Sequence, residues 1–368
     1  MEHLVSASFE VGNTVVVICP HGDLATRAAT IADAHQVHFS AADFSDHEHP
    51  PRWNLCEPPT GVTPTQWAAE LVHIIRAAWS DMPKEYFGPV WDKNMRVGLT
   101  VLTRDPRGPH PLSKLASVLL PPIQDEWVKA LGRICDSHLE RELHELHRAA
   151  TNDSEGSWWT WCTSKLEPFT ADDRMKRVID HCTSTIDLTR VLDGESLIVS
   201  APASALGDQG ANLMMGTILN QLWHFARLRT NPGQTIDLFV DEVHRIPPKV
   251  LSELLAEGRK FGIRLRLTTQ SPNQLAPEAR NAALNNSGAV GTFRTGPSEA
   301  QFLEPMFPTI SPGTLNRLSR HWLAITDGED ELIGPTIPPS VDPDDRSAIH
   351  AAHLDRHTAL ELKLAGLA

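Results

Sequence analysis

TIDLFVDEVHRI, residues 235–246, sets two adjacent carboxylates, Asp241 and Glu242, directly after a short apolar run. Charged side chains are rarely buried unless another group pairs with them. The apolar run is typical of a strand buried on both faces of a parallel sheet, and ligands bind at the carboxyl ends of such strands. Asp241 and Glu242 are therefore candidate site residues, although an isolated acidic pair can also cap the following helix and remain solvated.

Short apolar runs of the same kind recur along the chain and alternate with helical periodicity, which favours an α/β fold with a mostly parallel sheet. We expect four of them to be neighbours in one sheet, namely residues 14–18, 196–203, 237–240 and 263–269. Further strand candidates are 36–40 and 288–296, and a closing hairpin could form from 321–328 and 331–338. Gly262 is expected to end the helix that occupies about residues 249–260.

The segment from about residue 63 to residue 181 shows helical periodicity almost throughout, with no convincing strand. Strand patterns return only at residue 196. This layout predicts an all-α region inserted between two parts of an α/β core.

The composition restricts the class of protein. The chain has 368 residues, of which 41% are hydrophobic and 21% charged, as in globular proteins of two or three units or of one domain with a large insertion. Its formal net charge of −13 provides no overall basic field, so contact with nucleic acid needs a local patch or an assembled ring. The five cysteines form no C-x-x-C pair, and the sequence shows no signal peptide and no membrane-spanning run, which together predict a cytoplasmic protein.

Two further candidates follow from their positions. Gln270 ends the next expected strand, at the edge that carries Asp241, where an amide can sense a γ-phosphate or position water, although a loop glutamine is more often a plain surface residue. Arg259 and Lys260 fall in the last turn of the preceding helix, where cations complement the helix dipole. The alternative for Arg259 is an arginine that reaches into the nucleotide site of a neighbouring subunit.

Other clusters give weaker signals. The histidines that could suggest a metal are His47, His49, His138, His144 and His147. They lack a suitably spaced cysteine and lie among acidic residues, so we expect surface histidines rather than a metal site. The clustered tryptophans are Trp158, Trp159 and Trp161. They could stack on bases, but their spacing before a helix favours packing in the core or between domains.

The segment LFVDEVHRIPPKVLSELLAEGRKFGIRLRLTTQSPNQL, 238–275, resembles the Walker B to sensor region of the HerA/FtsK group of hexameric ATPases. Within that group it is most similar to the TraG/TraD-like coupling ATPases of conjugation and type IV secretion. VVVICPHGDL, 15–24, resembles the second core strand of the family, and NSGAVGTFRTGPSEAQFLEPMF, 286–307, resembles the strand after the sensor. The resemblance extends over nearly the whole chain and is strongest over residues 192–307.

The resemblance implies a RecA-like P-loop NTPase core with ATP and Mg²⁺ as cofactors. Asp241 would organise Mg²⁺ through water, Glu242 would be the catalytic glutamate, Gln270 the γ-phosphate sensor and Arg259 a finger acting in trans. Asp23 of the PHGDL segment would lie near the nucleotide without an assigned role. The partners implied are like subunits in a ring, which the resemblance implies is a hexamer, together with DNA or a nucleoprotein and a secretion channel. The chain then divides into residues 1–58 and 186–343 as two parts of the core, 59–185 as the all-α insertion and 344–368 as a helical tail.

The sequence departs from the family pattern in two places. Cys19 stands where the family usually has an aspartate, and a thiol cannot replace a carboxylate in the hydrogen-bond network around a metal site. The 368 residues contain no G-x-x-x-x-G-K-[ST] phosphate loop, and the helix after that loop is expected to begin almost at Met1. Either the start is placed late or the chain is a true fragment. The predicted function is an N-terminally truncated subunit of a ring-forming ATPase that drives DNA translocation.

Two alternatives remain open on the sequence alone. The first is a catalytically inactive remnant that serves as an assembly or interaction protein. The second is a DNA-binding protein that needs no nucleotide, for which this acidic chain shows no basic patch; the dependence of binding on salt would identify it.

Overall fold

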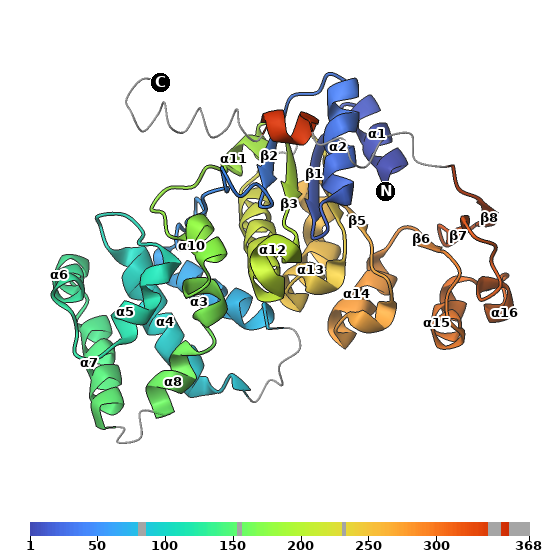
Figure 1. Cartoon of the computed structure of the whole chain (residues 1–368). Coiled ribbons are helices and arrows are strands. Elements are labelled where there is room, and N and C mark those ends of the chain that lie inside the picture. Colours follow the sequence, from blue (N-terminus) through green and yellow to red (C-terminus); the bar gives the residue numbers. More distant parts are fainter. Residues whose placement is uncertain (80–85, 153–156, 230–232, 338–346, 353–368) are drawn as a thin grey trace.

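A computed structural model describes residues 1–79, 86–152, 157–229, 233–337 and 347–352 (Figure 1). Within these residues five strands form one parallel sheet in the order β2-β3-β1-β4-β5. The strands are β1 (Thr14–Cys19), β2 (Phe39–Asp43), β3 (Ser196–Ser200), β4 (Ile236–Val240) and β5 (Ile263–Leu267). The predicted α/β class is therefore confirmed, and the four segments expected to be neighbours form the contiguous set β3-β1-β4-β5.

Alternate residues of the central strands face two separate cores. Val16 and Ile18 of β1 belong to a large cluster on one face of the sheet, whereas Val15 and Val17 belong to a smaller cluster on the other. Every residue of β1, β3 and β4 is buried. The mostly apolar runs in the sequence follow from this arrangement, because a strand covered on both faces favours apolar side chains at most of its positions.

Helices cover both faces of the sheet (Figure 1). The smaller cluster is completed by α1 (Glu2–Glu10), α2 (Asp23–Ala34) and a short helix at 347–352. The larger cluster includes α12 (Ala203–Arg227) and α13 (Pro248–Glu257). In the described part of the chain, no helix is both long enough and apolar enough to span a lipid bilayer.

The residues between β2 and β3 are helical wherever the structure describes regular elements there. These are α3 (Pro64–Ala77), α4 (Pro89–Arg104), η2 (Leu112–Lys114), α5 (Leu115–Leu119), α6 (Asp125–Ile134), α7 (Ser137–Asn152), α8 (Ser157–Thr163), α9 (Glu167–Thr170), α10 (Asp173–Ile179) and α11 (Thr189–Leu192). The first begins with a capping box, because Thr63 and Gln66 satisfy each other's backbone N–H groups. Figure 1 shows these helices gathered to one side of the sheet.

This helical region shares the larger core with the sheet. Trp67, Trp91 and Trp127 belong to the same continuous cluster as Val16 of β1. Asn212 of α12 also donates a hydrogen bond to the Ala78 carbonyl at 3.2 Å, which ties the region to the helix that covers the sheet. The domain boundaries at residues 58, 185 and 343 stay predictions.

A second, antiparallel sheet follows the main one in the order β6-β7-β8. Its strands are β6 (Val290–Thr292), β7 (Trp322–Thr326) and β8 (Glu331–Pro335), so the expected hairpin forms. The accompanying helices are η5 (Pro272–Gln274), α14 (Pro277–Asn286), α15 (Pro297–Leu303), η6 (Glu304–Met306) and α16 (Pro312–Leu315). Figure 1 shows this sheet set apart from the main one, beyond β5.

Two expected boundaries need adjustment. The strand predicted at 36–40 is β2 at Phe39–Asp43, because Gln36 adopts a positive φ of 55° in the turn after α2 and the buried residues are the four from Ser40 to Asp43. The helix predicted to end near residue 260 ends at Glu257 and continues as a 3-10 turn, η4 (Gly258–Phe261). Gly262 ends that turn with φ 75°, as expected for a glycine cap. Of the predicted tail, 347–352 is helical and 353–368 lies outside the described residues.

Candidate functional site

Asp241 follows β4 at the carboxyl edge of the sheet, and groups from two neighbouring strands fix its carboxylate. Its Oδ1 accepts hydrogen bonds from the Thr268 hydroxyl at 2.5 Å and from the Glu242 backbone N–H at 3.1 Å. The Cys19 thiol, at the end of β1, donates to Oδ2 over 3.7 Å. The carboxylate is therefore oriented mainly through Oδ1, while Oδ2 has only a weak donor.

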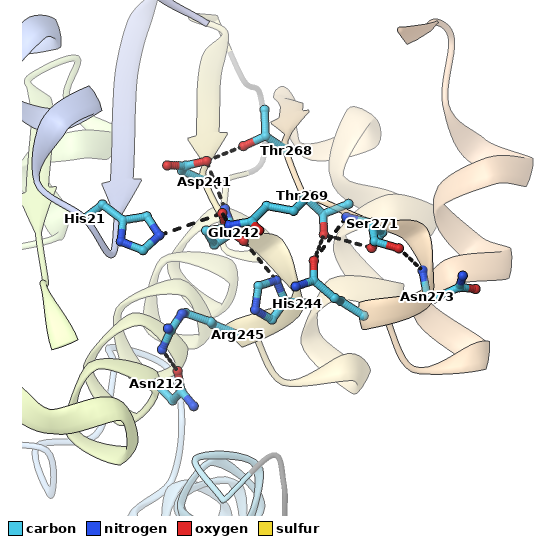
Figure 2. Close-up of polar contacts among 12 residues, drawn as sticks. His21, Asn212, Asp241, Glu242, His244, Arg245, Thr268, Thr269, Ser271 and Asn273 are labelled. Atoms are coloured by element: carbon cyan, nitrogen blue, oxygen red, sulfur yellow. Dashed lines mark hydrogen bonds and ion pairs between the residues drawn. The ribbon is translucent and has the colours of Figure 1, made fainter. Parts of the chain in front are cut away.

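Glu242 is buried, with 6% of its surface exposed, and adopts the left-handed conformation with φ 51°. This conformation is unfavourable for a residue other than glycine or asparagine, so the surroundings must hold it. The Gln270 amide donates to Glu242 Oε1 at 2.7 Å. His244 Nδ1 lies 3.2 Å from Oε2, and His21 Nε2 lies 3.7 Å from Oε1 (Figure 2).

Two loops hold this arrangement in place. After β4, Arg245 reaches α12 and donates to Asp208 Oδ1 and Asn212 Oδ1, both at 3.1 Å. After β5, Thr268 extends the ladder through its N–H to the Val240 carbonyl at 3.1 Å. The Gln274 side chain then accepts hydrogen bonds from Thr269 Oγ1 at 3.0 Å and from the Ser271 backbone N–H at 3.1 Å, which closes the turn beyond Gln270.

The structure brings together three of the candidates named from the sequence: Asp241, Glu242 and Gln270. It also adds Thr268, His21 and His244, which the sequence analysis did not single out. Thr268 could have been found by counting two residues back from Gln270 along the same strand end. The histidines carry no such signal, since His21 reaches Glu242 only because β1 and β4 are adjacent.

Cys19 acts in the structure as a donor. Its side chain is fully buried, and burial raises the pKa of the thiol, with the nearby Asp241 charge acting in the same direction. A protonated thiol can donate to Asp241, whereas an ionised carboxylate in the same place would repel it. The residue therefore orients Asp241, a role that the sequence analysis did not give to a thiol.

Arg259 lies at the opposite edge of the sheet from Asp241. It belongs to η4, before β5 begins, while Thr268 and Gln270 follow the five residues of β5. At a rise of about 3.3 Å per residue, the two edges are about 17 Å apart. The Arg259 side chain is exposed and makes no hydrogen bond or ion pair with any described residue. It cannot reach the carboxylates of its own chain.

Asp23 opens α2 and is exposed there. Among the described residues its carboxylate takes part in none of the contacts around Asp241 and Glu242. Asp23 therefore lies at the same carboxyl edge of the sheet as Asp241 and Glu242, but it does not contact them.

The other clusters lie elsewhere. The expected surface position is wrong for His147, which is buried with its Nε2 2.8 Å from the Val118 carbonyl. Burial lowers the pKa of this imidazole. Trp161 packs against the large core with Lys165 above its ring at 4.3 Å. The side chains of Trp158 and Trp159 lie outside what the structure describes. Over the described residues, no group of three or more histidine, cysteine, aspartate or glutamate side chains is suited to a metal.

Asp241 is the carboxylate of this site that is best placed for Mg²⁺. Mg²⁺ prefers oxygen ligands and usually retains several waters, and Asp241 Oδ2 is the acceptor with the weakest protein donor, so it suits an aqua ligand of the ion. The residues therefore fit Mg²⁺ held through water. No phosphate-binding loop accompanies this carboxylate, because the 368 residues contain no G-x-x-x-x-G-K-[ST] motif.

No protein-family model matches the chain, and no curated protein matches it by sequence. Solved structures do match it. The unbound conjugative coupling protein TrwB aligns over 95% of this chain and 83% of its own, with a TM-score of 0.62 and 13% identity. TrwB in complex with ADP and Mg²⁺ aligns over 94% and 83%, with the same TM-score and identity. VirB4 of Thermoanaerobacter pseudethanolicus aligns over 90% and 84%, with a TM-score of 0.57 and 14% identity.

The chain has the fold of the TrwB coupling protein. This agrees with the resemblance found in the sequence, which covered nearly the whole chain. In this TrwB-like fold the five-stranded parallel sheet carries Asp241, Glu242 and Gln270 together at its carboxyl edge. The identity of 13% establishes the fold and leaves the activity to be argued from the site.

Proposed function

We propose that this chain is a subunit of a ring-forming ATPase that couples ATP hydrolysis to the movement of DNA, as in conjugation or type IV secretion. The observation that carries the proposal is the carboxylate pair Asp241–Glu242 at the carboxyl edge, bonded to Thr268 and Gln270 of the adjacent strand. The TrwB fold supports it, because that conjugative coupling protein has been solved with ADP and Mg²⁺.

Each residue of the pair has a distinct part in this proposal. Asp241, held through Oδ1, presents Oδ2 to the water shell of Mg²⁺. Mg²⁺ supplies neutralisation of phosphate charge when bound with ATP. Glu242 orients the attacking water. Gln270 donates to Glu242 Oε1, so an amide that turned towards a γ-phosphate would release this oxygen. Gln270 thus links phosphate sensing to the freedom of Glu242.

In the same proposal, Arg259 acts on the nucleotide that is bound by a neighbouring subunit. Asp241 and Glu242 of the same chain lie about 17 Å from Arg259, at the opposite edge of the sheet. A role of Arg259 in hydrolysis therefore requires the nucleotide site of a second chain. The partners are then like subunits in a ring, DNA or a nucleoprotein, and a secretion channel. The proposed location of the protein is the cytoplasm, where binding to its partners would hold it at the inner face of the membrane.

The alternative function is an inactive assembly or interaction protein. The observation that favours it is the lack of a phosphate loop in the 368 residues, which leaves the β- and γ-phosphates without backbone N–H donors or a lysine. Under the main proposal, ATP binding requires a loop supplied from outside these residues.

The test is ATP turnover in a form of the chain preceded by a strand and a G-x-x-x-x-G-K-[ST] loop, with and without DNA. We expect turnover that DNA stimulates and that Glu242→Gln reduces by about 10²-fold to 10⁴-fold. The matched control is Glu257→Gln, an exposed glutamate at the end of α13, which should leave turnover unchanged. Turnover insensitive to Glu242→Gln contradicts the assigned role, and a form that binds no nucleotide favours the interaction protein.

A further inference from the structure

The side chain of Asn212 connects the all-α region between β2 and β3 to the loop that carries Glu242. Asn212 is buried in α12, and its two polar atoms bond to different parts of the molecule. Its amide donates to the carbonyl of Ala78, the residue that caps the end of α3, at 3.2 Å. Its Oδ1 accepts from Arg245, in the loop after β4, at 3.1 Å (Figure 2). One buried side chain therefore satisfies a helix end on one side and a guanidinium on the other.

Arg245 is also the residue that closes the single turn after Glu242. That turn is η3 (Val243–Arg245), and the Arg245 N–H donates to the Glu242 carbonyl at 3.0 Å. Glu242 stands immediately before the turn in the left-handed conformation, with its carboxylate 3.2 Å from His244 Nδ1. The guanidinium of Arg245 is anchored on α12. A shift of α12 therefore moves the turn, and the backbone of Glu242 with it.

A close approach further along α12 joins the same three elements. Gly216 lies four residues after Asn212 and so on the same face of the helix. A Cβ atom at Gly216 would lie 3.0 Å from Cγ of Pro247, in the loop after β4, and 3.4 Å from Cγ2 of Ile74 in α3. Glycine inside a helix is less stable than alanine, and the close packing on both sides explains it here. This face of α12 is therefore packed tightly between α3 and the loop, and tightly packed elements transmit displacement.

We propose that Asn212 is a positioning residue for Glu242, and that through it the end of α3 controls the turn that holds this carboxylate. The inference rests on the proposed ATPase function and adds to it the regulation of the same site. A movement of the all-α region that displaces the end of α3 pulls on Asn212, and Arg245 carries the displacement to the turn. Asn212 acts on Glu242 through the backbone of the turn, because its bonds in the described structure go to Ala78 and Arg245.

The first test needs no ATP and uses the chain of 368 residues. Amide hydrogen exchange is measured at Arg245 and Ile246, whose N–H groups close the turn, and at residues 238–240 of β4 as the internal reference. We expect Asn212→Ala to speed exchange in the turn about tenfold and to leave β4 unchanged, because it removes one buried hydrogen bond to Arg245. Asn212→Asp keeps an acceptor for Arg245 and should preserve the protection of the turn. The matched control is Asn220→Ala, a buried asparagine of the same helix, which should leave the turn as it is in the parent.

The link to α3 is tested by a second change at the end of that helix. Trp79 follows Ala78, and its indole N–H donates to the Lys165 carbonyl at 3.1 Å, which ties the end of α3 to the rest of the all-α region. Trp79→Phe removes this bond and should speed exchange in the turn several-fold. The same change should have no such effect in Asn212→Asp, because an ionised carboxylate cannot donate to the Ala78 carbonyl. An equal effect of Trp79→Phe in both backgrounds overturns the coupling.

The second test measures ATP turnover in the form of the chain that carries a phosphate loop. We expect Asn212→Ala to lower kcat about tenfold with KM for ATP within a few-fold of the parent, because a displaced Glu242 affects the chemical step and not nucleotide binding. Asn212→Asp should lower kcat less than Asn212→Ala does. Turn exchange that is equal in Asn212→Ala and the parent, or an equal loss of kcat in Asn220→Ala, overturns the inference. If the parent has no turnover, or turnover insensitive to Glu242→Gln, the proposed function fails, whereas the exchange comparison still decides the positioning role of Asn212.

Discussion

Replacing Arg259 by alanine separates the two interpretations of this residue. In the isolated chain the substitution removes an exposed side chain that contacts no described residue through a hydrogen bond or ion pair. Its charge lies about 17 Å from the carboxylate pair, beyond the screening length of about 8 Å at physiological salt. We therefore expect a change in unfolding free energy of at most about 1 kcal/mol, which is the value of a cation at a helix end.

In an assembled ring the same substitution has a much larger expected effect. A residue that neutralises transition-state charge on a neighbouring subunit's nucleotide contributes about 10³-fold or more to turnover. The measurement is steady-state ATP hydrolysis by Arg259→Ala in the form supplied with a phosphate loop, beside Glu242→Gln. Mixing the two inactive variants should restore part of the activity, because some interfaces then combine an intact arginine with an intact glutamate.

The matched control is Lys260→Ala, the adjacent cation, which lies over the Phe261 ring at 5.3 Å. Turnover of Lys260→Ala should remain within a few-fold of the parent. If Arg259→Ala also remains within a few-fold, the trans-acting role is wrong and the residue is only a helix-end cation.

Two further predictions concern buried groups. Cys19→Asp should destabilise the fold by about 2–4 kcal/mol at neutral pH, because it buries a second carboxylate beside Asp241. Cys19→Ser keeps a hydrogen-bond donor and should cost less than about 1 kcal/mol. Equal stability of the two variants in denaturant unfolding contradicts the donor role of the thiol. Asp105 is buried, and Arg133 above all, then His110, hold its pKa well below the usual range. A depressed carboxyl pKa gives stability that is fully present above the unfolded value of about 3.9 and is lost as the pH falls below it. The stability difference between the parent and Arg133→Gln should therefore shrink between about pH 4 and about pH 2. A difference that stays constant over this range refutes the ion pair as its source.

The central strands could be predicted because a strand that is buried on both faces consists mainly of apolar residues. The runs at β1, β3 and β4 are mostly apolar, and the structure buries every residue in them, including the charged Asp237 of β4. β2 was misplaced by three residues because its buried positions, Ser40 to Asp43, are small or polar residues that carry little strand preference.

The site residues that follow directly from the order of the strands could be predicted from the sequence. Asp241, Glu242 and Gln270 end two successive strands, and the parallel arrangement brings them to one edge. His21 and His244 were missed because their approach to Glu242 depends on loop conformation, including the left-handed backbone at Glu242 itself. The role of Cys19 was missed because the sequence does not show whether a buried thiol faces a carboxylate.

The most direct test of the central claim is calorimetric titration of ATP with Mg²⁺ into two forms of the protein. One form is the chain of 368 residues, and the other carries a strand and phosphate loop before it. The account predicts weak or undetectable binding to the first, micromolar affinity for the second, and loss of that affinity in Asp241→Ala. Micromolar affinity in the first form, or micromolar affinity in the second that survives Asp241→Ala, contradicts the assignment of this carboxylate edge as the nucleotide site.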